Sequence, residues 1–297
     1  MRSPEERRMT GFETALVQAD PRVGDKEGNL KKMAKVVRDH PAQLYLFGEL
    51  YLSGYMARDQ FPKLAEPLEG PSVREVSRIA QEANAHIIFG MPEQDTESGL
   101  RYNSSVFVFP DGDAVAYRKL YPANFGPFEE LQYFRRGNEL KVVRSDLGKI
   151  GLLICYDAFF PEVSKGLALQ GADVLACISA APATSKPFFD RVIPARAIEN
   201  TCFFLYANLV GTELSMVFEG GTQAMGPRGE DLGRVPSFEE GVVTFTVDAR
   251  DVLAARKFRP TIRDTRPEVL ALLQEIPARE EEDTLTLSTF AGPEDPP

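Results

Sequence analysis

The chain has 297 residues, of which 43% are hydrophobic and 26% are charged, and its formal net charge at pH 7 is −10. An acidic chain of this kind repels nucleic acid and anionic membrane surfaces, so we expect neither as a partner. No run approaches the roughly 18 apolar residues that span a bilayer. The charged start MRSPEERRMTG lacks the apolar core of a secretory signal. We therefore expect a cytoplasmic protein.

The predicted elements alternate between strands and helices along most of the chain. From period and composition, strands are expected at 12–20, 43–47, 86–90, 102–109, 114–119, 140–143, 150–154, 174–178, 203–208, 222–225 and 242–247. Helices are expected at 28–40, 73–85, 163–172, 188–200, 251–257 and 267–274, and the segment 125–137 is expected to be a loop with at most one helical turn.

This order fits helices that cover sheets on both sides within one domain, which we place at residues 10–274. Residues 275–297 form a tail that is first acidic and then rich in Thr, Ser and Pro. Such a segment is either disordered or packed on a partner subunit.

The cysteines and histidines limit the chemistry that the chain can carry. The three cysteines, Cys155, Cys177 and Cys202, each lie in an apolar stretch, and their spacing favours neither a disulfide framework nor a metal site. The two histidines, His40 and His86, are far from any cysteine in the sequence. If a cysteine is the nucleophile, a carboxylate is therefore favoured as its base.

The stretch KIGLLICYDAFFPE (149–162) is typical of a strand that ends at Cys155, turns sharply and enters a helix. The apolar run 150–154 suits a strand that is buried on both faces, and Asp157 is expected to cap the following helix. Cys155 would then lie where open α/β sheets bind ligands, and the helix N-terminus would favour its thiolate. The alternative is a small buried apolar residue, a common role for free cysteine.

Three other positions could carry chemistry beside Cys155. Glu49 directly follows the apolar strand 43–47, and is either a general base at the same sheet edge as Cys155 or an exposed loop acid. Lys119 ends the strand 114–119, and is either a solvated cation or one placed beside a developing oxyanion. Glu129 and Glu130 lie in an aromatic-rich loop, and composition alone does not choose between them.

A second charged pair favours a structural interpretation. Arg196 and Glu199 are three residues apart on a predicted helix, a spacing that allows them to pair on one face.

Taken in order, these motifs resemble those of the nitrilase, or carbon–nitrogen hydrolase, superfamily over about residues 14–248. GELYLSGY (48–55) resembles the first family motif, the segment from Asn103 to Lys119 the second, and GLLICYD with FPE (151–162) the third. The resemblance implies that Glu49 is the base, Lys119 the catalytic lysine and Cys155 the nucleophile. The second family glutamate precedes the phenylalanine of a Tyr-Phe-x-x-Gly element by four residues, which selects Glu130 over Glu129.

The resemblance implies an α-β-β-α sandwich and a Cys-Glu-Lys site that needs neither a metal nor an organic cofactor. It also implies a homodimer or a larger homo-oligomer, paired through helices next to the site. Tyr55, Tyr156 and Ala180 are weaker candidates for lining the substrate pocket, and ordinary packing is the alternative for each.

The residues after the cysteine indicate a branch of the family. Nitrilases proper usually have Trp-Glu after the cysteine, whereas Tyr156-Asp157 indicates the amidases and carbamoylases. We therefore expect hydrolysis of a small amide to a carboxylic acid and ammonia. The alternative is an N-carbamoyl amidohydrolase that releases carbon dioxide and ammonia; for amino-acid substrates it would need a cation, such as Lys186 or Arg191. A nitrilase proper, a catalytically silent binding protein and a thiol redox protein are less favoured.

Overall fold

The computed structural model describes residues 11–275. The chain divides into two units at residue 262, and the second unit contributes helix α9 (Pro267–Gln274) to the described part. Residues 276–297, and with them nearly all of the predicted tail, lie outside the described residues. None of the described helices is both long and apolar enough to cross a membrane.

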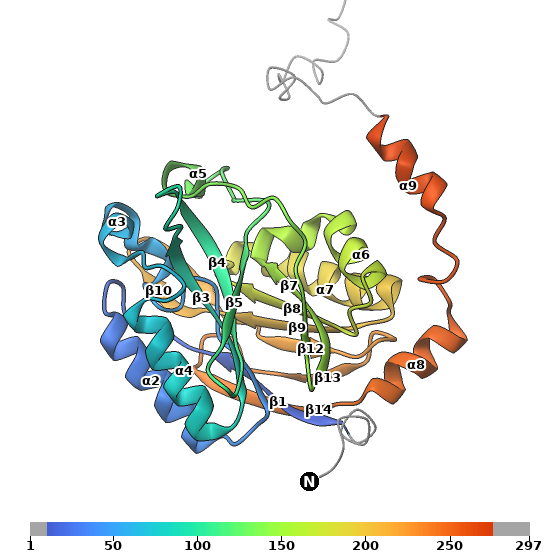
Figure 1. The fold of residues 1–297 in the computed structure, drawn as a ribbon, viewed down its shortest axis with the longest axis horizontal. Helices are drawn as coiled ribbons and strands as arrows, with labels where there is room; N and C mark the ends of the chain where they lie inside the picture. Colours follow the sequence, from blue (N-terminus) through green and yellow to red (C-terminus); the bar gives the residue numbers. More distant parts are fainter. Residues whose placement is uncertain (1–10, 276–297) are drawn as a thin grey trace, which may run out of the picture. The chain divides into compact units, whose positions relative to one another are not determined.

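The first unit contains two six-stranded sheets that face each other (Figure 1). In spatial order, the first sheet is β14 (Gly241–Val247), β1 (Phe12–Gln18), β2 (Leu44–Leu46), β3 (His86–Gln94), β4 (Arg101–Val108) and β5 (Ala114–Arg118). The second sheet is β13 (Asp231–Arg234), β12 (Gln223–Met225), β9 (Phe203–Asn208), β8 (Val174–Ser179), β7 (Gly148–Ile154) and β6 (Val142–Ser145).

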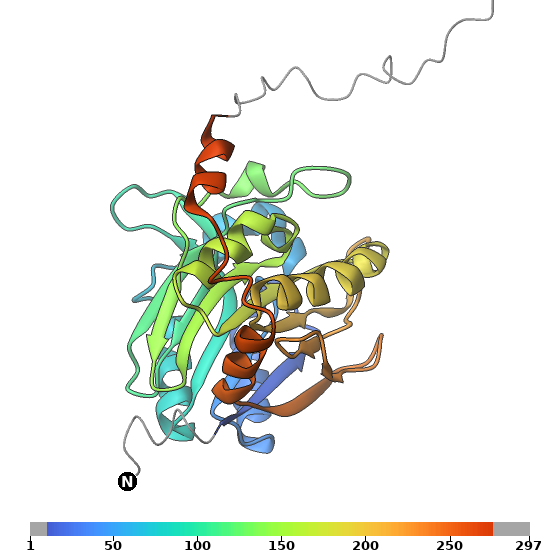
Figure 2. The same cartoon turned by 90° about the vertical axis from the view of Figure 1, so that its right-hand side faces the viewer.

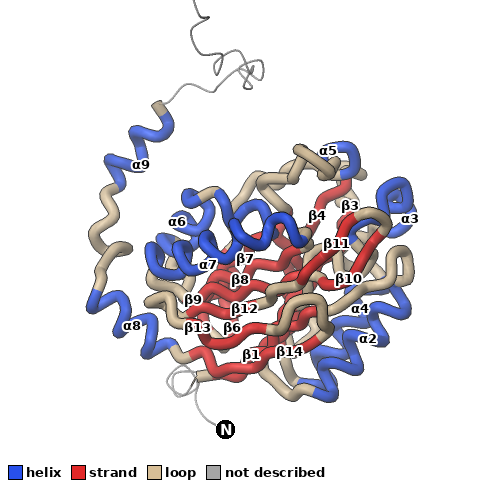
Figure 3. The backbone as a smooth tube through the Cα atoms, turned by 180° about the vertical axis from the view of Figure 1, so that it is seen from behind, coloured by secondary structure: helices blue, strands red, loops and turns tan. Residues whose placement is uncertain are grey.

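Helices cover the outer face of each sheet (Figures 2 and 3). Helices α2 (Lys26–Asp39) and α4 (Pro71–Ala83) pack on the first sheet, and α6 (Pro161–Leu169) and α7 (Lys186–Asn200) pack on the second. Helix α8 (Ala249–Phe258) follows β14. The predicted α-β-β-α sandwich is therefore confirmed.

Strand β2 shows why the sequence forms these layers. Successive side chains of a strand point to opposite faces of the sheet. Leu44 and Leu46 are fully buried in the core between the two sheets, whereas Tyr45 belongs to the core beneath the helices. The Tyr45 hydroxyl reaches the carbonyl of Val37 in α2 at 3.1 Å. Because both faces of β2 are covered, its sequence is apolar throughout.

Several short elements differ from the sequence-based expectation. The hairpin of β10 (Val210–Glu213) and β11 (Met216–Glu219) was not predicted, because its turn at Leu214 has a φ of +53° without the glycine or asparagine that marks such turns. Strand β13 was missed because it is short and polar. Short helical turns lie at Tyr55–Gln60, α3 (Phe61–Leu64), α5 (Glu130–Tyr133), Cys155–Phe159 and Ala183–Ser185.

Candidate active site

The predicted site residues come together from the two sheets. Glu49 follows β2 and Lys119 follows β5 in the first sheet, whereas Cys155 follows β7 in the second. The expectation that Glu49 and Cys155 share one sheet edge is therefore wrong, because their strands belong to different sheets. The sheets pack face to face, and the charges of Glu49 and Lys119 both act on the Cys155 thiol.

Backbone contacts fix the position of Glu49, which is fully buried. Its N–H donates to the carbonyl of Ser179 in the second sheet at 3.1 Å. On the other side, a Cβ at Gly90 of β3 would lie 2.7 Å from the Glu49 Cα and 2.2 Å from the backbone nitrogen of Leu50. Only glycine permits this approach. The Glu49 segment is thus held between the two sheets.

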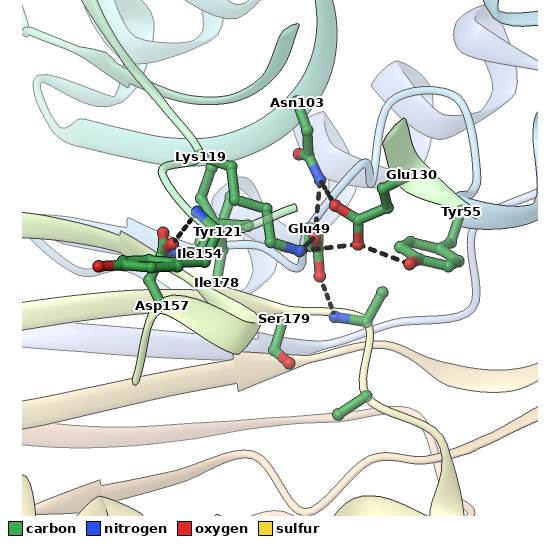
Figure 4. A network of polar contacts seen from close by, with 12 residues as sticks. Glu49, Tyr55, Asn103, Lys119, Tyr121, Glu130, Ile154, Asp157, Ile178 and Ser179 are labelled. Carbon is green, nitrogen blue, oxygen red and sulfur yellow. Dashed lines mark hydrogen bonds and ion pairs between the residues drawn. The ribbon is translucent and has the colours of Figure 1, made fainter. Parts of the chain in front are cut away.

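A polar network joins Glu49, Lys119 and Glu130 (Figure 4). The Lys119 Nζ lies 2.7 Å from Glu49 Oε1 and 2.8 Å from Glu130 Oε1. Asn103 Nδ2 donates to Glu49 Oε1 at 2.7 Å, and the Tyr55 hydroxyl donates to Glu130 Oε1 at 2.7 Å. One buried ammonium is therefore shared by two buried carboxylates.

Burial and charge act against each other in this network. Burial acts to lower the pKa of Lys119, but the carboxylates of Glu130 and Glu49 outweigh it and hold that pKa well above its usual value. Burial raises the pKa of Glu130, against the lowering effect of Lys119. Lys119 is consequently a permanent cation at neutral pH, as electrostatic stabilisation of an oxyanion requires.

Cys155 lies at a sharp turn directly after β7. Its φ of +47° is uncommon for a residue other than glycine, and such conformations occur at functional turns. The side chain is buried, with 8% of its surface exposed. Burial and the Glu49 charge raise the pKa of the thiol, and they outweigh the lowering effects of Lys119 and of a hydrogen bond with Ser179.

The expected stabilisation of a Cys155 thiolate by a helix N-terminus is therefore wrong. A short turn, Cys155–Phe159, separates the cysteine from α6, which begins only at Pro161. The thiol is protonated at rest, so a nearby base has to accept its proton before or during attack on a substrate.

Asp157 also differs from its expected role as the cap of α6, where Phe160 occupies the cap position instead. The fully buried Asp157 carboxylate accepts hydrogen bonds from the backbone N–H of Ile154 at 3.0 Å, the backbone N–H of Tyr121 at 2.9 Å and the Tyr117 hydroxyl at 2.8 Å. The bonds from Ile154 and Tyr121 join the Cys155 turn to the segment that follows Lys119, and Figure 4 shows Asp157 next to both residues.

Arg196 supports the Cys155 turn from α7. Its guanidinium donates to the carbonyls of Ala158 at 2.8 Å and Phe159 at 3.2 Å. It also pairs with Glu199 at 3.0 Å, which confirms the predicted pair.

The predicted pocket residues contribute in different ways. Tyr55 directs its hydroxyl to Glu130, and Ala180 donates its backbone N–H to Glu49 Oε2 at 2.8 Å while its side chain is fully buried. Tyr156 is half-buried, and its ring lies 4.9 Å from the ring of Phe125. Tyr55 and Ala180 thus hold the two glutamates, whereas Tyr156 belongs to an aromatic cluster next to Cys155.

The structure distinguishes the two loop acids and places the two candidate cations. Glu130 is buried against Lys119, whereas Glu129 is exposed. Lys186 pairs with Asp190 at 2.5 Å, and Arg191 donates to a backbone carbonyl of its own helix. Across residues 11–275, no group of His, Cys, Asp and Glu side chains is placed to hold a metal ion.

Sequence reasoning assigned no role to Asn103 and Ser179, which contact Glu49 and Cys155 respectively. Asn103 lies in the second family motif, which is a signal that could have singled it out. Nothing in the local sequence marks Ser179, because its place depends on the packing of β8 against the first sheet.

Comparison with known proteins adds independent information. The family model for carbon–nitrogen hydrolases matches residues 13–257. A probable nitrilase of Schizosaccharomyces pombe is 35% identical over 82% of this chain and 91% of its own length. An (R)-stereoselective amidase of a Pseudomonas species is 33% identical over 84% of this chain and 90% of its own length. A mutant of an amidase from Nesterenkonia AN1, of the nitrilase superfamily, has a similar structure with a TM-score of 0.76. It is 25% identical in sequence, and the match covers 90% of this chain and 97% of that chain.

Proposed function

Because this chain belongs to the carbon–nitrogen hydrolase family and is an enzyme of that family, we propose that it hydrolyses a small linear amide to a carboxylic acid and ammonia. The observation that carries the proposal is the buried cluster of Glu49, Lys119 and Glu130 beside the Cys155 thiol. A protonated thiol, a carboxylate and a permanent cation are the groups that acyl transfer through a cysteine requires.

In the first step, Glu49 accepts the thiol proton while the Cys155 sulfur forms a bond to the amide carbon. The negative charge that develops on the carbonyl oxygen is stabilised by Lys119 and by the backbone N–H of Tyr156. Glu49 Oε1 accepts from both Lys119 and Asn103, whereas Oε2 accepts only the Ala180 N–H, so Oε2 keeps a lone pair that can take the proton without loss of these contacts.

In the second step, protonated Glu49 gives its proton to the leaving nitrogen, the C–N bond breaks, and ammonia leaves a thioester on Cys155. Water then attacks the thioester carbon while Glu49 accepts a proton from it. The C–S bond breaks, and the sulfur regains its proton as the acid is released. Glu130 and the Tyr55 hydroxyl hold Lys119 in place during these steps.

The proposal is tested by ammonia release from simple amides, ω-amides, N-carbamoyl compounds and nitriles, with the acyl-enzyme detected by mass spectrometry. Wild type is compared with Cys155→Ala and with Cys202→Ala, a matched change at another buried cysteine. We expect amide turnover and acylation in wild type and Cys202→Ala, and neither in Cys155→Ala.

Other results would lead to other conclusions. Release of carbon dioxide together with ammonia from N-carbamoyl compounds would favour the carbamoyl hydrolase alternative. If wild type releases nothing and Cys155 forms no covalent adduct with any substrate, the proposed amidase function is wrong. A cytoplasmic location and assembly into a homodimer or larger oligomer also stay proposals, and light scattering of the purified protein would measure the assembly.

A further inference from the structure

Glu213, at the end of β10, is a buried carboxylate outside the Lys119 network. Only 3% of its surface is exposed. Its Oε2 accepts the backbone N–H of Met56 at 2.7 Å, whereas its Oε1 has no hydrogen-bond partner in the part of the chain that the structure describes. Burial raises the pKa of this carboxyl to about 7, against the lowering effects of the backbone N–H groups of Met56 and Tyr55. Among the described residues it makes no salt bridge. Because a buried carboxyl group is costly without compensating contacts, the Met56 hydrogen bond and the nearby Tyr55 N–H are the main contacts that offset its burial.

The two N–H groups belong to the segment that places Tyr55 in the site. They begin the short helical turn Tyr55–Gln60, where backbone donors have no partner within the turn. Gly54, directly before it, has a φ of +74°, and a Cβ there would lie 2.9 Å from the Val23 Cα. The backbone directly before Tyr55 is therefore a constrained bend. Glu213 of the β10–β11 hairpin holds the backbone directly after this bend.

The same hairpin also contacts the Tyr55 ring. Phe218 of β11 is fully buried and meets this ring edge-on, with 6.0 Å between the centroids. Phe128 meets the ring from another direction, with 6.3 Å between the centroids. One hairpin thus holds both the backbone and the ring of Tyr55.

The Tyr55 hydroxyl and the Lys119 ammonium donate to the same oxygen, Oε1 of Glu130, at 2.7 and 2.8 Å. A shift of Tyr55 would therefore change the charge that Glu130 presents to Lys119. Displacement of a catalytic group by about 1 Å can cost about 100-fold in rate.

We propose that Glu213 is a positioning residue for the reaction, which acts by holding the Tyr55 and Met56 backbone so that the Tyr55 hydroxyl meets Glu130. This inference rests on the proposed amidase function. Glu213 does not touch the reacting atoms, and its effect passes through Tyr55 to Glu130 and Lys119.

The test is a double-mutant cycle in the full chain with Glu213→Met and Tyr55→Phe. Methionine is of similar size and apolar, but it offers no carboxylate to the two N–H groups. We expect Glu213→Met to lower kcat by up to about 10-fold, the loss expected for Tyr55→Phe, with a smaller change in KM. Glu213→Gln keeps one carbonyl oxygen and should restore most of kcat. The double variant should be no slower than the slower single variant, because both changes interrupt one path.

The matched control is Val217→Thr, an isosteric change at a half-exposed position of the same hairpin, which should keep wild-type kcat. All rates are divided by the concentration of folded protein, measured by circular dichroism, so that a loss of folded protein does not lower kcat. If Glu213→Met does not fold, Glu213→Asp replaces it, because the shorter carboxylate cannot hold both N–H groups at their present positions.

Two results would overturn the inference: wild-type kcat in Glu213→Met, or kcat losses of the two changes that multiply in the double variant. Failure of the amidase proposal itself looks different, since wild type would then show no turnover that depends on Cys155.

Discussion

Arg118 and Lys119 are adjacent in the sequence, yet they enter two different charge clusters. Each cation pairs with two acids. Arg118 Nη2 lies 2.7 Å from Asp95, and its Nε lies 3.1 Å from Glu93, while Lys119 Nζ lies within 2.8 Å of Glu49 and Glu130. They diverge because successive side chains of an extended chain point in opposite directions.

Burial separates the two clusters. The Arg118 side chain is 31% exposed and lies over the Tyr102 ring, whereas the Lys119 side chain is fully buried. Hydrogen bonds from Ser98 and Arg118 lower the pKa of Asp95, but burial raises the pKa of Glu130 despite its contact with Lys119. The pKa values of Asp95 and Glu130 thus shift in opposite directions although the two clusters hold the same number of charges, and the buried cluster is the one suited to catalysis.

The largest expected effect on kcat comes from replacing Lys119, and the matched comparison replaces Arg118. Lys119→Met should lower kcat by about 1,000-fold, because an oxyanion donor is lost, and should destabilise the fold by about 3–5 kcal/mol, because two buried carboxylates lose their counterion. Arg118→Met should also lower the unfolding free energy but should leave kcat within about threefold of wild type. Steady-state kinetics and urea unfolding of both variants check this. Equal losses of kcat in both variants would contradict the assignment of catalysis to the buried Lys119 cluster alone.

A smaller effect is expected from neutralising one acid of each cluster. Glu130→Gln removes one of the two negative charges beside Lys119 and should lower kcat by about 10- to 100-fold. Glu93→Gln makes the same change beside Arg118, and we expect kcat to stay near that of wild type. The two variants are compared at saturating substrate and with unfolding curves, and a Glu130→Gln enzyme of full activity would remove Glu130 from the mechanism.

Removal of a single hydroxyl group should have a smaller effect on kcat than either of these changes. Tyr55→Phe removes the hydrogen bond to Glu130 Oε1 and should lower kcat by about 10-fold, in proportion to the loss of one bond to a charged group. Tyr102→Phe keeps the ring beneath Arg118 and should not change kcat. Measured side by side, equal rates for the two variants would argue against a role of the Tyr55 hydroxyl.

The last expected effect concerns the stability of the fold and its dependence on pH, and it comes from Asp157. Burial raises the pKa of this carboxyl from 3.8 to about 6, so the folded protein holds the proton more tightly than the unfolded chain. This contribution to stability, about 3 kcal/mol, is complete below pH 4 and is lost as the pH rises through 6. Unfolding free energies of wild type and Asp157→Asn between pH 4 and 7 should therefore show a flatter dependence in the variant. Parallel curves of unfolding free energy against pH would contradict the raised pKa of Asp157.

Local pattern accounts for much of the fold. The buried strands β7, β8 and β9 were predicted because continuous apolar runs of their length are typical of parallel strands covered on both faces. The hairpin of β10 and β11 was missed, and with it Glu213, because its turn has no local marker. Choosing Glu130 over Glu129 needed the family resemblance, since the two neighbours differ only in burial.

The sequence by itself determined that Glu49, Lys119 and Cys155 follow predicted strands, because strand ends are set by local composition. Only the tertiary structure decided that Glu49 and Cys155 come from opposite sheets, that Asp157 joins the two segments, and that the Cys155 thiol is protonated at rest. The reason is physical: the pKa of a buried group depends on desolvation by every surrounding atom and on charges brought near it by folding, and neither is encoded in its sequence neighbours.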